Sequence, residues 1–379
     1  MKKLLILLVP ILLLASVGGA LWWKYGRGAD PFARAQEMMD KGDLRSAGLE
    51  LRAILRGNPN NAAAHYRLGQ VAQRTGDPVA AEKEYKLARE KGFETRLLNV
   101  PLAQTYMAQG HYRELLRDFP TQGLPADQAA PLMTTRAMAQ MSLGDVKGAL
   151  ATASDAERQA PQSVDAALAT ARIMVTTKDY AGAEAKVERA LQLDSRSQDA
   201  LIMKGQLLNL KGDRVRATEA FDAVLAFNPR NLNGRLERAN ILIMDGKDVR
   251  AKADVDEAIR IQPRSSMAIF LRGVLAVKAE DYAAADADLS KVANFLARFP
   301  RGFFFYAITK YNIGQAEQAS DSANKYLARN PNDPDAIKLY SRIELASRRS
   351  AGVIGLLTKS QQAGIADADM LDQIGRAHV

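Results

Sequence analysis

The sequence contains no cysteine, and only three histidines, His65, His111 and His378, occur along its 379 residues. The lack of cysteine excludes disulfide frameworks, thiolate nucleophiles and cysteine-based zinc sites. The histidines are too few and too scattered to build a histidine-rich metal site. Aromatic residues are also sparse, at 6%. We therefore expect no metal and no cofactor.

Sequence motifs for catalysis are absent as well. There is no glycine-rich phosphate loop, no paired-histidine helix motif and no serine-centred elbow. Asp286 and Asp288 alternate with alanine, but the glycine and glutamate of a calcium loop do not follow them. We predict no catalytic residue and a protein that is not an enzyme.

Charge of one sign is only mildly in excess, with 52 Lys and Arg against 43 Asp and Glu. Spread over the whole chain, a net charge of +9 does not indicate nucleic-acid binding. The composition is 47% apolar and rich in helix-forming residues, which excludes a disordered chain and predicts an all-α fold.

Residues 1–27 begin with an uncharged stretch from Leu4 to Trp23, preceded by Lys2 and Lys3. Twenty helical residues span about 30 Å, the thickness of a bilayer core. The lysines predict a cytoplasmic N-terminus, and Trp22 and Trp23 suit the opposite interface. We expect a single-pass inner-membrane anchor with the remaining chain in the periplasm, if the cell is Gram-negative.

The alternative is a cleaved signal peptide, because Gly18, Gly19 and Ala20 provide small residues near a suitable cleavage position. The protein would then be secreted to the periplasm. Both interpretations place residues after 27 outside the cytoplasm.

Residues 28–367 repeat with a period of 34, which divides them into ten units without an insertion. The eighth position of every unit is small, and the twentieth is alanine in eight units. The fifteenth is glycine in seven units, often followed by aspartate, which predicts a left-handed helix end and a capped second helix. The twenty-fourth is apolar or alanine, and the thirty-second is often proline, which ends the second helix.

This pattern resembles the tetratricopeptide repeat (TPR), most clearly in residues 198–231 with Gly205, Gly212, Ala217 and Phe221. The resemblance implies a right-handed superhelical solenoid of tandem helix-turn-helix repeats that binds protein or peptide partners in a concave groove. The third unit departs most, because Leu115 replaces alanine and its second helix is expected to end near Phe119.

The ninth position of the units is the candidate groove position. Five of its ten residues are carboxamides, which can donate to and accept from a peptide backbone. The fifth position adds aromatic side chains that would form apolar pockets. The candidate groove residues are Gln36, Gln70, Gln104, Arg172, Gln206, Asn240 and Arg342 at the ninth position and Tyr66, Phe270 and Phe304 at the fifth. The alternative is that the fifth position is core and the ninth is merely solvated.

The seventh position is basic in five units, at Arg34, Arg136, Lys204, Arg238 and Arg272. These side chains either favour an acidic partner or cover apolar surface while their charged ends stay in water. A groove that binds polysaccharide would need regularly spaced exposed aromatics, and few positions qualify.

The end of the sequence breaks the repeat. Residues 368–373 read as the start of a further repeat, whereas residues 374–379 match no repeat position. The last six residues are similar to a translated sequencing adapter, which predicts non-native sequence at the end of a truncated gene fragment.

The anchor and the first units also resemble the exported repeat protein of exosortase (PEP-CTERM) exopolysaccharide systems, in residues 40–43, 58–62, 69–72 and 76–84. We therefore expect a non-catalytic, membrane-anchored scaffold that serves an envelope, exopolysaccharide or protein-sorting system. The alternative is a targeting arm of a larger enzyme or outer-membrane export protein whose active or pore-forming part lies beyond this sequence.

Overall fold

A computed structural model describes residues 30–299, 301–349, 351–362 and 364, and within these ranges every regular element is a helix. No helix in the described ranges combines the length and apolar character needed to cross a bilayer. The predicted anchor at 1–27, the start of a further repeat at 368–373 and the sequence at 374–379 lie outside the described residues.

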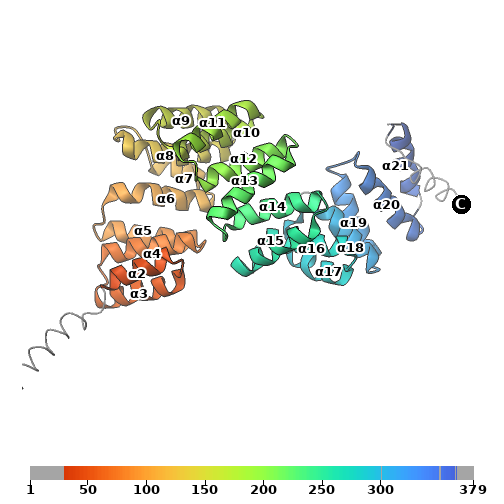
Figure 1. The fold of residues 1–379 in the computed structure, drawn as a ribbon, viewed down its shortest axis with the longest axis horizontal. Coiled ribbons are helices and arrows are strands. Elements are labelled where there is room, and N and C mark those ends of the chain that lie inside the picture. The colour runs from red at the N-terminus through yellow and green to blue at the C-terminus, as the bar shows by residue number, and fades with distance from the viewer. Residues whose placement is uncertain (1–29, 300, 350, 363, 365–379) are drawn as a thin grey trace, which may run out of the picture. The chain divides into compact units, whose positions relative to one another are not determined.

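The chain divides into two units, which we describe separately. In residues 30–195, consecutive helices lie side by side as antiparallel pairs, each pair forming one repeat (Figure 1). Its helices are α2 (Pro31–Asp40), α3 (Leu44–Gly57), α4 (Ala62–Arg74), α5 (Pro78–Glu90), α6 (Thr95–Gln109), α7 (Tyr112–Asp118), α8 (Ala126–Ser142), α9 (Val146–Gln159), α10 (Val164–Thr176) and α11 (Tyr180–Leu193).

The second unit, from residue 196 onward, continues the same pairing. Its helices are α12 (Gln198–Leu210), α13 (Arg214–Phe227), α14 (Leu232–Met244), α15 (Asp248–Ile261), α16 (Ser266–Lys278), α17 (Tyr282–Leu289), the 3-10 helix η1 (Ser290–Arg298), α18 (Gly302–Asn312), α19 (Ala316–Leu327), α20 (Pro334–Ala346) and α21 (Ala351–Gln362). The predicted all-helical tandem repeat is confirmed.

Each first helix ends in a left-handed residue at the fifteenth repeat position, as predicted. The glycines there have φ between 72° and 85°, for example Gly212 at 84° and Gly246 at 72°. Three repeats lack this glycine, and Lys178, Glu280 and Arg348 adopt the same conformation with φ of 62°, 57° and 55°. The packing of the two helices therefore imposes the turn even where the residue disfavours it.

The predicted aspartate caps are also present. The side chain of Asp213 accepts a hydrogen bond from the backbone of Arg216 at 3.1 Å, and Asp43, Asp77 and Asp145 cap their helices in the same way. Each cap satisfies a donor that the first turn of a helix would otherwise leave without a partner.

Helices of one repeat approach closely because the eighth position is small where the twenty-fourth is large. A Cβ atom added to Gly69 would lie 2.5 Å from the ring of Tyr85, and one added to Gly205 would lie 2.5 Å from the ring of Phe221. Both rings are fully buried. The small residue at the eighth position thus leaves space for the large side chain at the twenty-fourth, and the two pack together at the centre of the repeat.

Two second helices differ from the others. Helix α7 has only seven residues and ends before Phe119, as the sequence predicts for the third repeat. The second helix of residues 282–298 changes instead from α to 3-10 geometry at Ser290, which the repeat pattern does not predict.

Candidate functional site: the face formed by the first helices

Within each unit, the first helices of successive repeats pack against one another. Helix α4 contacts α6, α6 contacts α8, and α8 contacts α10, while in the second unit α12, α14, α16, α18 and α20 contact in succession. Among the described residues, no comparable contact joins two successive second helices. First helices are therefore closer together than second helices, so each stack bends toward them, and they line its inner face.

Two of the predicted carboxamides, Gln206 and Gln104, form hydrogen bonds between neighbouring first helices. The amide of Gln206 donates to Glu237 at 2.7 Å, from α12 to α14, and Gln104 accepts from Gln73 at 2.8 Å, from α6 to α4. These bonds join successive first helices, so part of the hydrogen-bonding capacity at the ninth position stabilises the stack itself.

Two other carboxamides form hydrogen bonds within their own helix. Gln36 donates to Asp40 at 2.7 Å and Gln70 donates to the hydroxyl of Tyr66 at 3.1 Å. The side-chain oxygens of Gln36 and Gln70 are buried and accept no hydrogen bond within the described protein. Asn240 is half-buried on α14.

The three aromatic candidates at the fifth position are not equivalent. Tyr66 is half-buried and stacks on Phe93 with ring centroids 4.4 Å apart. Phe270 is 2% exposed and stacks on Phe299 in the core, so its burial favours the packing alternative at this position. Phe304 is 8% exposed but lines a cavity.

That cavity, of about 370 Å³, lies between α18 and α20 on the inner face and combines apolar and charged walls. Phe304 and Ile308 supply apolar surface from α18, whereas Arg342, an exposed candidate residue, stands at its α20 side. The other candidate arginine, Arg172, is exposed on α10 in the first unit. The remaining lining residues are Tyr282, Tyr311, Asn312, Asp335, Lys338 and Leu339.

The sequence analysis did not select Tyr311 and Asn312. Both follow Ile308 by three and four residues on the same helix, a spacing that places side chains on one face. Tyr311 and Asn312 could therefore have been predicted from the sequence, because they lie three and four residues after the ninth repeat position. A second cavity of about 370 Å³, lined by Leu49, Thr75 and Glu84 among others on α3, α4 and α5, has no counterpart in the predicted site.

Basic residues at the seventh position have internal partners, which neither sequence-based alternative included. Arg34 and Arg272 contact acids sixteen residues later, Glu50 (Nε to Oε1, 2.9 Å) and Asp288 (Nε to Oδ2, 2.5 Å). Arg136 instead donates to backbone carbonyls at the end of the short helix α7. Burial lowers the pKa of Arg136. An acid at the twenty-third position is the sequence signal for these pairs.

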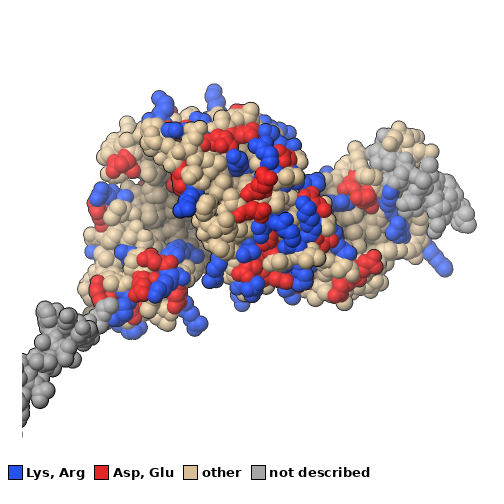
Figure 2. All heavy atoms as spheres, viewed as in Figure 1, with Lys and Arg blue, Asp and Glu red and all other residues tan. Residues whose placement is uncertain are grey.

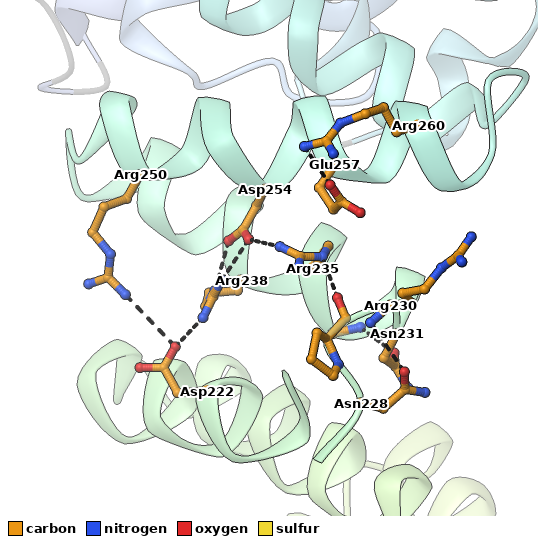
Figure 3. Close-up of polar contacts among 12 residues, drawn as sticks. Asp222, Asn228, Arg230, Asn231, Arg235, Arg238, Arg250, Asp254, Glu257 and Arg260 are labelled. Atoms are coloured by element: carbon orange, nitrogen blue, oxygen red, sulfur yellow. Dashed lines mark hydrogen bonds and ion pairs between the residues drawn. The ribbon is translucent and has the colours of Figure 1, made fainter. Parts of the chain in front are cut away.

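The most connected of these pairs is Arg238 with Asp254, which joins α14 to α15 (Figure 3). Nε and Nη2 of Arg238 lie 2.7 and 2.6 Å from the two Asp254 oxygens, and Nη1 lies 2.5 Å from Asp222 on α13. Arg235 adds a third donor to Asp254 at 2.9 Å. Hydrogen bonding to Asp254 raises the pKa of Arg238 against the opposing effect of burial. This network ties three consecutive helices together.

His65 is a structural residue. It is 8% exposed, with Nδ1 2.7 Å from Glu84 and Nε2 3.1 Å from the carbonyl of Pro59. Within the ranges that the structure covers, no group of three His, Asp or Glu side chains is placed to hold a metal ion.

Comparison with known families supports the repeat. A family model described as tetratricopeptide repeat matches residues 32–93, 134–200 and 176–231. No curated protein matches the sequence.

Several solved structures are similar to this chain. The APC/C hetero-tetramer Cut9–Hcn1 is 10% identical, covers 90% of this chain and 95% of its own chain, and has a TM-score of 0.51. Pseudomonas aeruginosa PilF is 16% identical over 56% of this chain and 96% of its own, with a TM-score of 0.49. Yeast Tom70 is 14% identical over 94% of this chain and 90% of its own, with a TM-score of 0.44. At such low identity, the match to Cut9–Hcn1 supports the fold alone.

Proposed function

Because this chain belongs to the tetratricopeptide repeat proteins, we propose that it is a non-catalytic scaffold whose inner face binds an extended segment of a partner protein. The observation that carries the proposal is the cavity between α18 and α20. It offers apolar walls for one side chain of the partner and polar groups at its rim for the partner backbone.

The inner face suits a polypeptide better than a small ligand. First helices present a repeating surface along each stack, with carboxamides at the ninth position of five repeats. An extended chain carries backbone N–H and C=O groups at regular intervals, so it can pair with polar side chains along a stack.

The proposal also places this scaffold in the envelope. Its support is the uncharged run after Lys2 and Lys3, with Trp22 and Trp23 at the far end, which suits an inner-membrane anchor with the repeats in the periplasm. The resemblance to exosortase-associated repeat proteins suggests exopolysaccharide export or protein sorting as the setting. A reporter active only in the periplasm, fused after residue 364, should be active; an inactive fusion would contradict this placement.

The groove is tested by affinity capture with the full chain, using a lysate of the source organism. We expect the double variant I308E/R342E to lose the captured partner, because it places negative charge in the apolar wall and removes the cation at the rim. Circular dichroism would check that helicity is unchanged.

The matched control is L49E, which adds one charge at a residue that is 58% exposed and lines the cavity between α3 and α5. Retention of the partner by L49E and its loss by I308E/R342E would support the inner face. The reverse result would assign binding to the other cavity and overturn the proposal.

A further inference from the structure

Four arginines recur at one repeat position on the edge formed by the loops between repeats. Arg196, Arg230, Arg264 and Arg298 are each 34 residues apart, at the thirty-third position of consecutive units, and all four are exposed. All belong to the unit that begins at residue 196. Equivalent positions of a repeat array fall in a row along one edge, so these residues form a row, which we call the arginine edge.

Two of these arginines, Arg230 and Arg264, lie in hydrogen-bonded turns between helices. In the loop after α13, Asn231 N–H donates to the carbonyl of Asn228 at 2.9 Å, and Arg230 N–H donates to the Asn228 side chain at 3.1 Å. Ser265 N–H likewise donates to the carbonyl of Gln262 at 3.0 Å, across the turn that holds Arg264. Arg230 and Arg264 are therefore each the third residue of a hydrogen-bonded turn. Arg298 is instead the last residue of η1, where Phe299 N–H donates to the carbonyl of Leu296 at 3.2 Å.

Within this region, Arg235 and Arg238 are bound by carboxylates of neighbouring helices, and Arg230 and Arg264 are the two members of the row to compare with them. Arg235 and Arg238 turn inward to Asp254, but the side chain of Arg230 points away from that network (Figure 3). Over the residues the structure covers, neither Arg230 nor Arg264 forms a side-chain ion pair. Basic side chains gather over the region of α14 and α15, with acidic ones beside them (Figure 2).

Exposed aromatic rings stiffen both ends of the arginine edge. The Arg196 guanidinium lies 5.0 Å from the ring centroid of Phe227, and that of Arg298 lies 5.2 Å from Phe295. Phe227 and Phe295 are 47% and 39% exposed, although large apolar side chains are normally buried. Cation–π contacts restrict the arginine rotamers, which lowers the entropy lost when an anion binds.

The spacing of the row selects the partner. Helices α12, α14, α16 and α18, which follow the four loops, pack in succession, and packed helices lie roughly 8–10 Å apart. A polyproline II segment advances about 3.1 Å per residue with three residues per turn, hence about 9 Å per turn. Carboxylates at every third residue of such a segment would match the arginines. Duplex DNA carries a charge every ~1.7 Å, far denser than this row.

We propose that the arginine edge binds an extended acidic segment of a partner protein, in polyproline II conformation, with a carboxylate at every third residue. Arginine suits this role because its planar guanidinium binds carboxylates with two parallel hydrogen bonds. The site is separate from the inner face, so it would give the scaffold a second contact and does not depend on the groove.

The test uses the full chain and two synthetic peptides of identical composition. One peptide repeats Glu-Pro-Pro five times, and the other places its five glutamates in one block. We expect the periodic peptide to bind several-fold more tightly at low salt, and added salt to weaken it, because exposed charge pairs are screened.

R196Q/R230Q/R264Q/R298Q should weaken binding of the periodic peptide roughly tenfold, since four exposed ion pairs are each worth little alone. The double variant R230Q/R264Q, which disturbs no side-chain ion pair, should show about half of that effect on a logarithmic scale. The matched control R216Q/K247Q/R250Q/K252Q removes the same charge from residues that are also exposed and should change affinity little.

Three outcomes would overturn the proposal. Equal affinity for the periodic and block peptides would remove the spacing argument, and equal weakening by both quadruple variants would indicate non-specific charge attraction. Binding of phosphatidylserine vesicles through the arginine edge, with no peptide binding, would make it a membrane-contact surface. The groove variant I308E/R342E should bind the periodic peptide normally, so failure of the groove and failure of this edge can be told apart.

Discussion

Individual residues in this array carry backbone strain where the repeat demands a glycine and the sequence provides another residue. Glu280 ends α16 with φ 57°, in the turn that seven repeats assign to glycine. The left-handed conformation costs a non-glycine residue roughly 1–2 kcal/mol. The turn offsets part of this cost, because it allows Asp281 N–H to donate a hydrogen bond to the carbonyl of Ala276 at 2.9 Å.

We expect E280G to raise the free energy of unfolding by about 0.5–1 kcal/mol, since glycine relieves the strain but loses more entropy on folding. Urea unfolding followed by circular dichroism would measure the shift of the midpoint. E280A is the control, because alanine removes the side chain and keeps the strained backbone. Equal stabilisation by both variants would show that the glutamate side chain, and not φ, is responsible.

At the scale of helices, ion pairs between the first and second helix of one repeat supplement the apolar contact. Asp288 on α17 is 6% exposed and is held by Arg272 on α16 and by Lys291. Burial alone would raise the pKa of Asp288, but the hydrogen bonds with Arg272 and the nearby Lys291 outweigh it and keep this pKa below its usual value. The folded chain therefore favours the ionised carboxylate.

The lowered pKa of Asp288 predicts how its ion pair with Arg272 responds to acid. Because the pKa is depressed on folding, the pair stabilises the fold above the unfolded aspartate pKa of about 3.9 and loses that contribution as pH falls through the lower folded value. D288N should cost roughly 1–2 kcal/mol at pH 7. The difference from the unchanged chain should shrink at pH 3. Urea midpoints at both pH values would measure it.

The control for this prediction is D256N, whose carboxylate pairs with Lys252 at the surface, where both side chains are exposed. It should change stability little at either pH. A D288N effect of the same size at pH 3 as at pH 7 would show that shape, and not charge, is what Asp288 contributes.

At the scale of the whole array, the helices that the structure describes pack, within each unit, against their neighbours along the chain. Such a chain has no single core, and its stability is a sum of repeat and neighbour contributions. A destabilising substitution in one repeat should therefore unfold that repeat and its neighbours and leave distant repeats folded.

F221A tests this directly. Phe221 is fully buried against Gly205, so its truncation should cost about 3–5 kcal/mol. Hydrogen exchange measured by mass spectrometry should show lost protection in α12, α13 and α14, and unchanged protection in α2 to α5. The control F227A truncates a phenylalanine of the same helix that is 47% exposed. Uniform loss of protection from α2 to α21 would mean that the chain unfolds as one cooperative body.

The sequence predicted on which helices most candidate residues lie, but it did not predict their hydrogen-bond partners or their burial. The repeat positions of Gln206 and Arg342 correctly indicated the first helices, because residues at 34-residue intervals occupy equivalent places. Whether Gln206 is available to a partner depends on Glu237, which lies on another helix. Phe270 and Phe304 share a repeat position, yet one lies in the core and the other lines a cavity.

The sequence by itself determined the period, the helix pairs, the left-handed turns and the small-to-large packing within each repeat. These follow from local physics: glycine tolerates positive φ, aspartate caps a helix, and 3.6 residues per turn decide which side chains share a face. Only the tertiary structure decided that Lys178 and Glu280 take the turn without glycine and that Arg238 binds Asp254. It also decided that Arg230 forms no ion pair with any residue the structure describes. Those outcomes depend on distances between helices that local sequence does not encode, because each is set by the packing of neighbouring repeats.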